Sequence, residues 1–131
     1  MKKLLLSLLI LSSTLFSQPP FLTQGYIPHY TKKLASNWDS DFLELSDKQK
    51  SKLIKIRKET MSEVNKSKAL LAPLEQELAD KILKNEKPEN LKNLIKKIAV
   101  YKSEATMVHL KCVYNTQQVL TTEQLNLLPS L

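Results

Sequence analysis

Three side chains on one stretch of the chain have the chemistry of metal ligands, namely Met107, His109 and Cys112. His109 and Cys112 are three positions apart, so a helix would place both side chains on one face, within reach of a common ion. A thiolate together with an imidazole suits Zn(II) or Cu(I). Two ligands are too few for either ion, so a third would have to come from His29, Met61, a carboxylate or a second subunit.

The same two residues also fit an ordinary hydrophobic core. Cys112 falls on a seven-residue repeat of apolar positions, where a buried thiol behaves as a small hydrophobe, and His109 lies beside it. Because Cys112 is the single cysteine, it cannot form an internal disulfide; it either stays a buried thiol or links two subunits. A structural role and a metal site are therefore both open for this pair.

The composition argues against catalysis and for helices. The chain has 131 residues and a single glycine, which excludes the glycine-rich loops that bind phosphates and dinucleotides. Leu, Lys, Glu, Ala and Gln fill the chain instead, and these residues favour helices. No nucleophile can be matched to a partner base, and no carboxylate pair marks a pocket. We therefore predict an all-helical protein that is not an enzyme.

The first residues have the layout of a secretory signal peptide. Lys2 and Lys3 precede the mostly apolar run 4–16, which is shorter than the ~20 residues that span a bilayer. We predict a signal peptide over residues 1–17, with an uncleaved anchor as the alternative. Export to a bacterial periplasm follows from this prediction. The formal net charge of +7 would otherwise indicate nucleic acid, but an exported protein does not meet chromosomal DNA.

The remaining chain divides into an arm and a helical domain. Residues 18–36 hold three prolines and the glycine and are expected to form an irregular arm. Helical spacing of apolar residues begins after them, so the helical domain is predicted over 37–128, opening with a short helix at 37–43. The side chains that this helix would bury are Trp38, Phe42 and Leu43.

Two long helices should follow and form an antiparallel hairpin. The first begins at Ser46, with a kink or a brief break at Pro73, because proline removes a backbone donor. A turn at 85–88 leads to the second helix, over 88–118, whose apolar residues recur every seven positions. Helices joined by so short a turn must lie antiparallel.

One five-residue motif occurs twice, at the two ends of this hairpin. Its members are Leu45, Ser46 and Gln49 in the first copy and Leu120, Thr121 and Gln124 in the second. A Ser or Thr before a helix, with Gln three positions later, forms a capping box in which each side chain bonds to the other residue's backbone N–H. The second box predicts a last short helix over 121–128 that stops at Pro129. There Leu120 can also pack onto Leu125, whereas the first copy has Lys50 in that place.

Lysine and arginine side chains crowd both long helices and have two interpretations. One is a solvated helix face. The other is a basic surface that attracts acidic or unfolded proteins and holds them through neighbouring apolar patches. The candidate client-binding residues are Lys52, Lys55, Arg57, Lys58, Lys96 and Lys97. A hairpin of two helices cannot bury its apolar seam on both sides, so some apolar surface should face a second subunit or a client.

The paired motif, behind an export signal, resembles the repeated Leu-Thr-x-x-Gln motif of the Spy/CpxP-type periplasmic proteins. The copy at Leu120–Gln124 matches fully, and the first copy has Ser46 in place of threonine, which preserves the cap. The resemblance covers roughly residues 37–128. It implies an all-helical, antiparallel dimer shaped like a shallow cradle. Members of the family act as ATP-independent chaperones or as envelope-stress modulators, and a metal-sensing branch binds ions through histidine, glutamate and methionine.

Two functions are therefore expected from different classes. The first is a periplasmic chaperone or stress modulator that works as a homodimer, without a cofactor, on unfolded envelope proteins or on the periplasmic domain of a sensor kinase. The second is a heavy-metal sensor or metal-binding protein of the same fold, using His109 and Cys112 with Zn or Cu. Where the metal-sensing branch has paired histidines in its arm, this chain has only His29. Nucleic acid is not an expected partner.

Overall fold

The computed structural model describes residues 19–23 and 25–131, which form helices and turns with no strand among them. The helices, in chain order, are α1 (Tyr30–Ser36), α2 (Asp47–Leu83), α3 (Lys92–Val119) and α4 (Thr122–Leu127), with short 3₁₀ helices at Pro88–Leu91 and Leu128–Ser130. The all-helical prediction is confirmed for this part of the chain. The predicted signal peptide lies outside the described residues. None of the described helices is long and apolar enough to cross a membrane.

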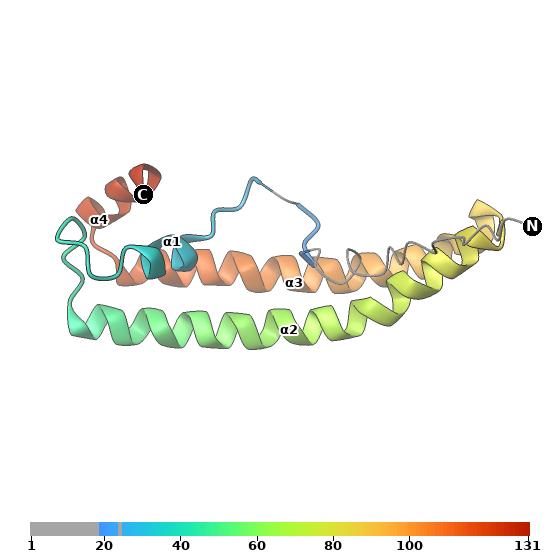
Figure 1. Ribbon diagram of the computed structural model, residues 1–131, viewed down its shortest axis with the longest axis horizontal. Helices are drawn as coiled ribbons and strands as arrows, with labels where there is room; N and C mark the ends of the chain where they lie inside the picture. The colour runs from blue at the N-terminus through green and yellow to red at the C-terminus, as the bar shows by residue number, and fades with distance from the viewer. Residues whose placement is uncertain (1–18, 24) are drawn as a thin grey trace, which may run out of the picture.

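The two long helices, α2 and α3, lie side by side and run in opposite directions (Figure 1). Each buries a stripe of small and medium-sized side chains, formed by Leu53, Val64 and Leu71 on α2 and by Ile98, Ala105 and Cys112 on α3. The seven-residue spacing on α3 keeps its stripe facing α2 along the hairpin. Further along, Lys102 of α3 pairs with Glu75 of α2 at 3.3 Å. The predicted antiparallel hairpin is confirmed.

The turn between the long helices follows from its residues. Lys84 caps α2 by donating its backbone N–H to the carbonyl of Asp80 at 3.1 Å. Asn85 has a φ of 59°, a left-handed conformation that asparagine adopts more readily than most residues. Pro88 starts the following 3₁₀ helix, where its missing N–H costs no hydrogen bond. The helix predicted from residue 88 therefore becomes α-helical at Lys92.

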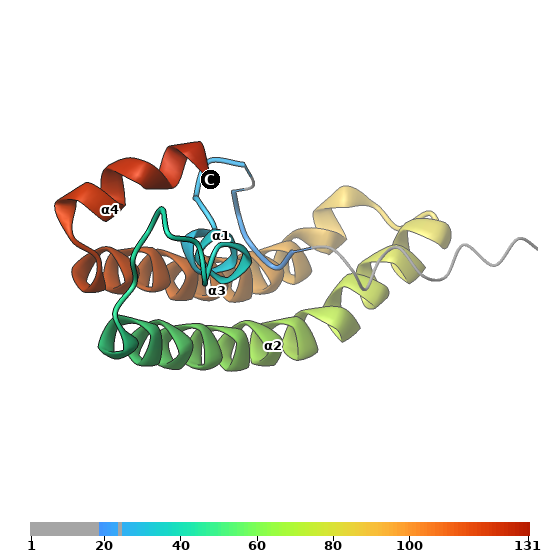
Figure 2. The same cartoon turned by 60° about the vertical axis from the view of Figure 1, so that its left-hand side comes forward.

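Pro73 lies inside α2, which continues through it without a break. Figures 1 and 2 show that α2 changes direction in its later part, which contains this proline. Proline offers no N–H to the carbonyl of Ala69, and both residues are exposed, so water can bond that carbonyl. Of the two outcomes expected at Pro73, the chain adopts the bent, continuous helix.

The first short helix lies earlier than predicted. α1 covers Tyr30–Ser36, whereas residues 37–43, the predicted position of this helix, form turns. Asn37 ends α1, because its side-chain amide donates to the carbonyl of Lys33 at 2.9 Å and its backbone N–H to that of Leu34 at 3.1 Å. The irregular arm predicted over 18–36 therefore ends before Tyr30. We call residues 19–23 and 25–29 the arm.

Packing explains this shift of the helix. Tyr30 and Leu34 are four positions apart, so both reach the core from one face of α1, and Leu34 is fully buried. Leu43 is buried and Trp38 half-buried, but both reach the core from turns. Phe42 is 53% exposed, so the prediction that it points inward is wrong. α1 thus contributes Leu34 to the same core as Leu53 of α2.

The largest core gathers where α2 begins and α3 ends, under α1 and α4 (Figure 2). Its buried members are Leu34, Leu43, Leu53, Leu120 and Leu128, all leucines. Leu125 and Leu131 pack against them from the C-terminal segment. α4 ends at Leu127, and a 3₁₀ helix over Leu128–Ser130 follows it. Contrary to the prediction, the chain therefore stays helical through Pro129. The C-terminal segment thus closes one end of the hairpin.

Candidate functional site

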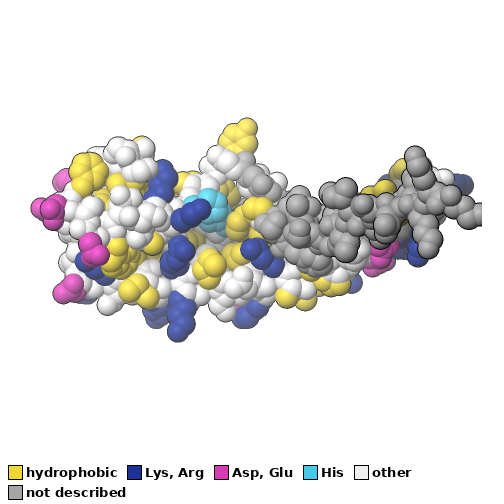
Figure 3. All heavy atoms as spheres, in the orientation of Figure 1, with side chains coloured by type: hydrophobic (Ala, Val, Ile, Leu, Met, Phe, Trp, Pro, Cys, Tyr) yellow, Lys and Arg dark blue, Asp and Glu magenta, His cyan; other side chains and the backbone are white. Residues whose placement is uncertain are grey.

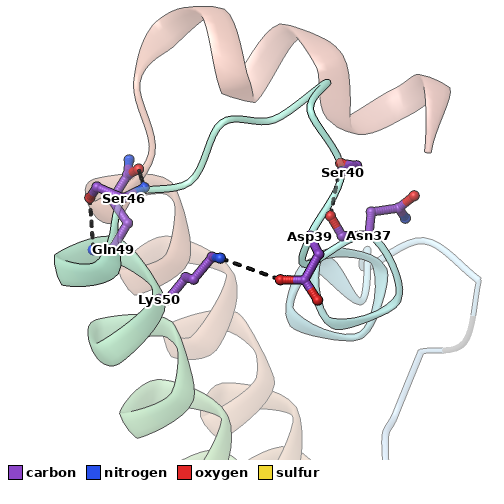
Figure 4. A network of polar contacts seen from close by, with 6 residues as sticks. All are labelled: Asn37, Asp39, Ser40, Ser46, Gln49 and Lys50. Carbon is purple, nitrogen blue, oxygen red and sulfur yellow. Dashed lines mark hydrogen bonds and ion pairs between the residues drawn. The ribbon is translucent and has the colours of Figure 1, made fainter.

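Both copies of the repeated motif form the predicted capping boxes. Ser46 Oγ accepts from the backbone N–H of Gln49 at 3.1 Å, and Gln49 Oε1 accepts from that of Ser46 at 3.0 Å (Figure 4). Thr121 and Gln124 repeat the arrangement at 3.2 Å and 2.9 Å. Each box satisfies two backbone N–H groups at a helix start that no helical carbonyl can reach.

The two capping boxes are also bonded to each other. The side-chain amide of Gln49 donates to Gln124 Oε1 at 2.7 Å, and that of Gln124 donates to Gln49 Oε1 at 3.3 Å. Their remaining N–H groups reach backbone carbonyls, Val119 for Gln49 at 3.0 Å and Leu43 for Gln124 at 2.8 Å. Each amide therefore uses both of its donors and both acceptor positions of its oxygen. Two stretches of the chain that are 75 positions apart at the two glutamines, 43–49 and 119–124, meet at this pair.

The other residues of the motif complete this end of the hairpin. Leu120 is buried in the leucine core, and Leu45 and Leu125 pack against the same core. Lys50, which replaces an apolar residue in the first copy, pairs instead with Asp39 at 3.5 Å (Figure 4). The side chain of Asp39 is 90% exposed, so this ion pair stabilises the fold little.

The candidate client-binding cations do not form one continuous face. Lys52, Lys55 and Lys58 are exposed on α2, but Arg57 is half-buried, one position and about 100° around the helix from Lys58. Lys55 also pairs with Glu59 at 3.9 Å. On α3, Lys96 and Lys97 are exposed. The structure thus distributes these six residues over several sides of the hairpin.

The outer side of α3 carries exposed apolar residues. Val100, Met107 and Tyr114 are 55%, 52% and 61% exposed. We call the buried residues Ile98, Ala105 and Cys112 of α3 the inner stripe. Each of the three exposed residues lies two positions after one of them, which turns it about 200° away from α2. Leu110, 41% exposed, lies between the last two. We call these four residues the outer stripe.

Of the two predicted metal ligands, His109 lies under the arm and Cys112 lies beside α1. His109 is only 4% exposed, and its Nε2 lies 3.2 Å from the carbonyl oxygen of Pro28. Because a carbonyl only accepts, Nε2 carries the proton in the neutral ring and Nδ1 is an acceptor, which has no partner among the described residues. Cys112 is buried, with Sγ 4.0 Å from Thr31 Oγ1.

Aromatic rings of the arm cover His109. The imidazole of His29 stacks on that of His109 with ring centroids 4.3 Å apart, and the ring of Phe21 lies 4.8 Å away. Burial, followed by the nearby His29, lowers the pKa of His109, while the Pro28 contact acts in the opposite direction. Burial and the charge of Lys32 lower the pKa of His29.

A cavity of about 310 Å³ lies beside these rings, between the arm, α1, α2 and α3. We call it the arm cavity. His29, Met61, His109 and Cys112 all line it. The structure therefore brings two of the candidate third ligands, His29 and Met61, near the predicted pair. Within residues 19–23 and 25–131, however, no group of three or more His, Cys, Asp or Glu side chains could hold a metal ion.

The packing of the arm on α3 is the feature that sequence reasoning missed. The backbone N–H of Leu22 donates to Thr106 Oγ1 at 2.9 Å, across more than eighty positions of sequence. Thr106, His109 and Val113 are spaced by three and four positions beside the inner stripe, a helical face of its own. That spacing was the one sequence signal for this contact. It was missed because Thr106 and His109 are polar, and polar residues do not usually indicate a buried helix face.

Comparisons with known protein families, with curated proteins and with solved structures find no match to this chain.

Proposed function

We propose that this chain is an exported, nucleotide-independent chaperone or envelope-stress modulator, which binds unfolded or misfolded proteins in the periplasm. The paired motif and its resemblance to the Spy/CpxP-type proteins support this assignment. The observation that carries it is the outer stripe, which leaves three large apolar side chains of α3 more than half exposed. Apolar surface of this kind on a folded protein marks an interaction site.

The outer stripe suits an extended apolar segment of a client. From Val100 to Tyr114 it runs about 21 Å along α3, at 1.5 Å per residue. Unfolded chains expose apolar side chains that a folded protein would bury, and these can pack on Met107 and its neighbours without a defined partner structure. Methionine adapts to varied shapes because its side chain is unbranched and flexible. Binding by contact alone needs no nucleotide.

Basic residues near the stripe would bring clients to it. Lys96 and Lys97 lie about one turn before Val100, and Lys111 is exposed beside Leu110. Their charges attract acidic or partly acidic chains over a distance of about 10 Å at 0.1 M salt. Lys52, Lys55, Arg57 and Lys58 add to the positive field from α2. We therefore propose steering by charge, followed by apolar contact with the outer stripe.

An aggregation assay tests this function. Purified protein at several-fold molar excess should suppress aggregation of a denatured client, and V100Q/M107Q/Y114Q should lose most of that protection. The matched control is I82Q/L83Q, which removes two exposed apolar side chains, 59% and 85% exposed, at the far end of the hairpin. Absence of suppression by the unaltered protein would refute the chaperone function and leave only the modulator, whose partner would be a sensor domain.

The alternative function, a heavy-metal sensor or metal-binding protein, is favoured by the arrangement of the arm cavity. His29 stacks on His109, and both rings line that cavity with Cys112 and Met61. Titration of Zn(II) and Cu(I) into the reduced protein distinguishes the two functions. Binding at micromolar concentration or tighter that His109→Ala abolishes would support the sensor. Absence of binding would leave Cys112 as a core residue.

A further inference from the structure

The arm cavity has the size and walls of a small-molecule site. Its volume of about 310 Å³ lies at the lower end of the range found for ligand pockets, about 300–1,000 Å³. Apolar side chains from three elements form much of its wall: Phe21 from the arm, Met61 and Val64 from α2, and Val113 from α3. A cavity this small, with such walls, fits a single short alkyl chain.

The charged residues of the cavity are all basic. Lys32 from α1 and Arg57 and Lys68 from α2 line it, and no aspartate or glutamate does. None of these three cations forms an ion pair with a residue of the described chain. Lys32 and Lys68 are exposed, so they lie where the cavity opens to water. Figure 3 shows Lys and Arg atoms on this face beside an exposed histidine. The cavity therefore favours an anion.

A second observation points to a ligand. His109 is 96% buried at the cavity wall, and its Nδ1 has no hydrogen-bond partner in the described part of the chain. Buried polar atoms in proteins are nearly always bonded, so an orphaned one marks a place where another molecule can bind.

We propose that the arm cavity binds a small amphipathic anion, with one short alkyl chain against Phe21, Met61, Val64 and Val113 and its head group among Lys32, Arg57 and Lys68. Carboxylates of the fatty-acid class have this chemistry. The site is separate from the outer stripe, which lies on the far side of α3 from α2. It goes beyond the proposed function and stands whether or not the chain is a chaperone.

Isothermal titration with 1-decanesulfonate, kept below its micelle-forming concentration, tests the proposal. This probe has a ten-carbon chain and stays ionised at every pH used. We expect saturable binding to one site per chain. Decanol and decyltrimethylammonium, which have the same chain without the negative charge, should each bind at least roughly tenfold more weakly, as expected for loss of close charge pairs near a surface. Equal binding of the three probes would overturn the proposal, as would no saturable binding of the sulfonate.

Two variants locate the site. K32Q/K68Q should weaken sulfonate binding by roughly tenfold and leave decanol binding unchanged, whereas K87Q/K92Q, which removes two exposed lysines at the far end of the hairpin, should bind like the unaltered protein. Equal affinities of the two variants would contradict the assignment.

Discussion

Two glutamine side chains join the ends of the hairpin, and their hydrogen bonding is complete. Gln49 and Gln124 each serve their own capping box and bond to each other. Gln124 is only 7% exposed, so water cannot easily replace a hydrogen bond that is lost at its side chain. Loss of one member of a buried polar pair costs more than the bond itself contributes, because the remaining group is left unsatisfied.

A double-mutant cycle measures this coupling. Q49A and Q124A should each destabilise the protein by about 1–3 kcal/mol, and the double variant should lose less than their sum by about 0.5–3 kcal/mol. Urea unfolding followed by circular dichroism gives the four stabilities. Q118A, at an exposed position of α3, is the control and should change stability little. Strict additivity of Q49A and Q124A would contradict a shared network.

The stacked imidazoles predict a pH dependence of stability. The fold lowers the pKa of His109 below its ordinary value of 6.5, so the unfolded chain takes up a proton first as the pH falls. Stability should therefore be greatest above about pH 6.5 and decrease between pH 6.5 and 5.5. H109F should flatten this decrease more than H29F does, because His29 is the more exposed ring. Unfolding curves at pH 6.5 and pH 5.5 check this prediction. The same loss of stability between the two pH values in the unaltered protein, H109F and H29F would disprove it.

At the scale of elements, local signals were sufficient for the long helices and insufficient for the short one. The capping box at Ser46 and the seven-residue repeat on α3 are set within a few turns of chain, so sequence alone located them. α1 has seven residues, too few to be stable by its own propensity, and burial of Leu34 against distant leucines decides its position.

The candidate site also has a part that the sequence predicts and a part that it does not. The two capping boxes were predictable because each bond joins residues three positions apart. The arm cavity was not, since it depends on contacts such as Leu22 with Thr106 and His29 with His109. Loop closure over about eighty residues has no local sequence signature, and the prolines of the arm indicate only an irregular chain.

Pro73 tests how α2 obtains its bend. A proline inside a helix removes one hydrogen bond and costs up to about 3 kcal/mol relative to alanine. P73A should therefore stabilise the protein by on the order of 1–3 kcal/mol and raise the unfolding midpoint in urea. S62A, at another exposed position of α2, is the control for ordinary helix propensity and should have a smaller effect. A destabilised P73A would mean that the bend itself is required for contacts with α3.

At the scale of the whole molecule, the hairpin is closed at one end, and within residues 19–23 and 25–131 many large apolar side chains are exposed. α1, α4 and the arm cover the hairpin where α2 begins and along one side, while large apolar side chains stay exposed on both long helices. They include Ile54 and Leu70 on α2 and the outer stripe on α3. Such a surface is typical of proteins that associate, with copies of themselves or with other chains.

We expect the protein to be a homodimer built from the long hairpin. Light scattering at micromolar concentration should give about twice the protomer mass, which is 15.0 kDa for the full chain. Burial of exposed apolar residues between two copies supplies the driving force. A mass equal to one protomer across the micromolar range would refute the dimer.

Crosslinking from single positions tests whether unfolded proteins bind along the outer stripe of α3. A photoreactive side chain replaces Met107 in one protein and Ser62, an exposed residue of α2, in another, and each is irradiated with an unfolded client. We predict that position 107 captures the client and position 62 does not, with capture at 107 competed away by excess unlabelled protein. Equal capture from both positions, or none from position 107, would contradict binding by the outer stripe.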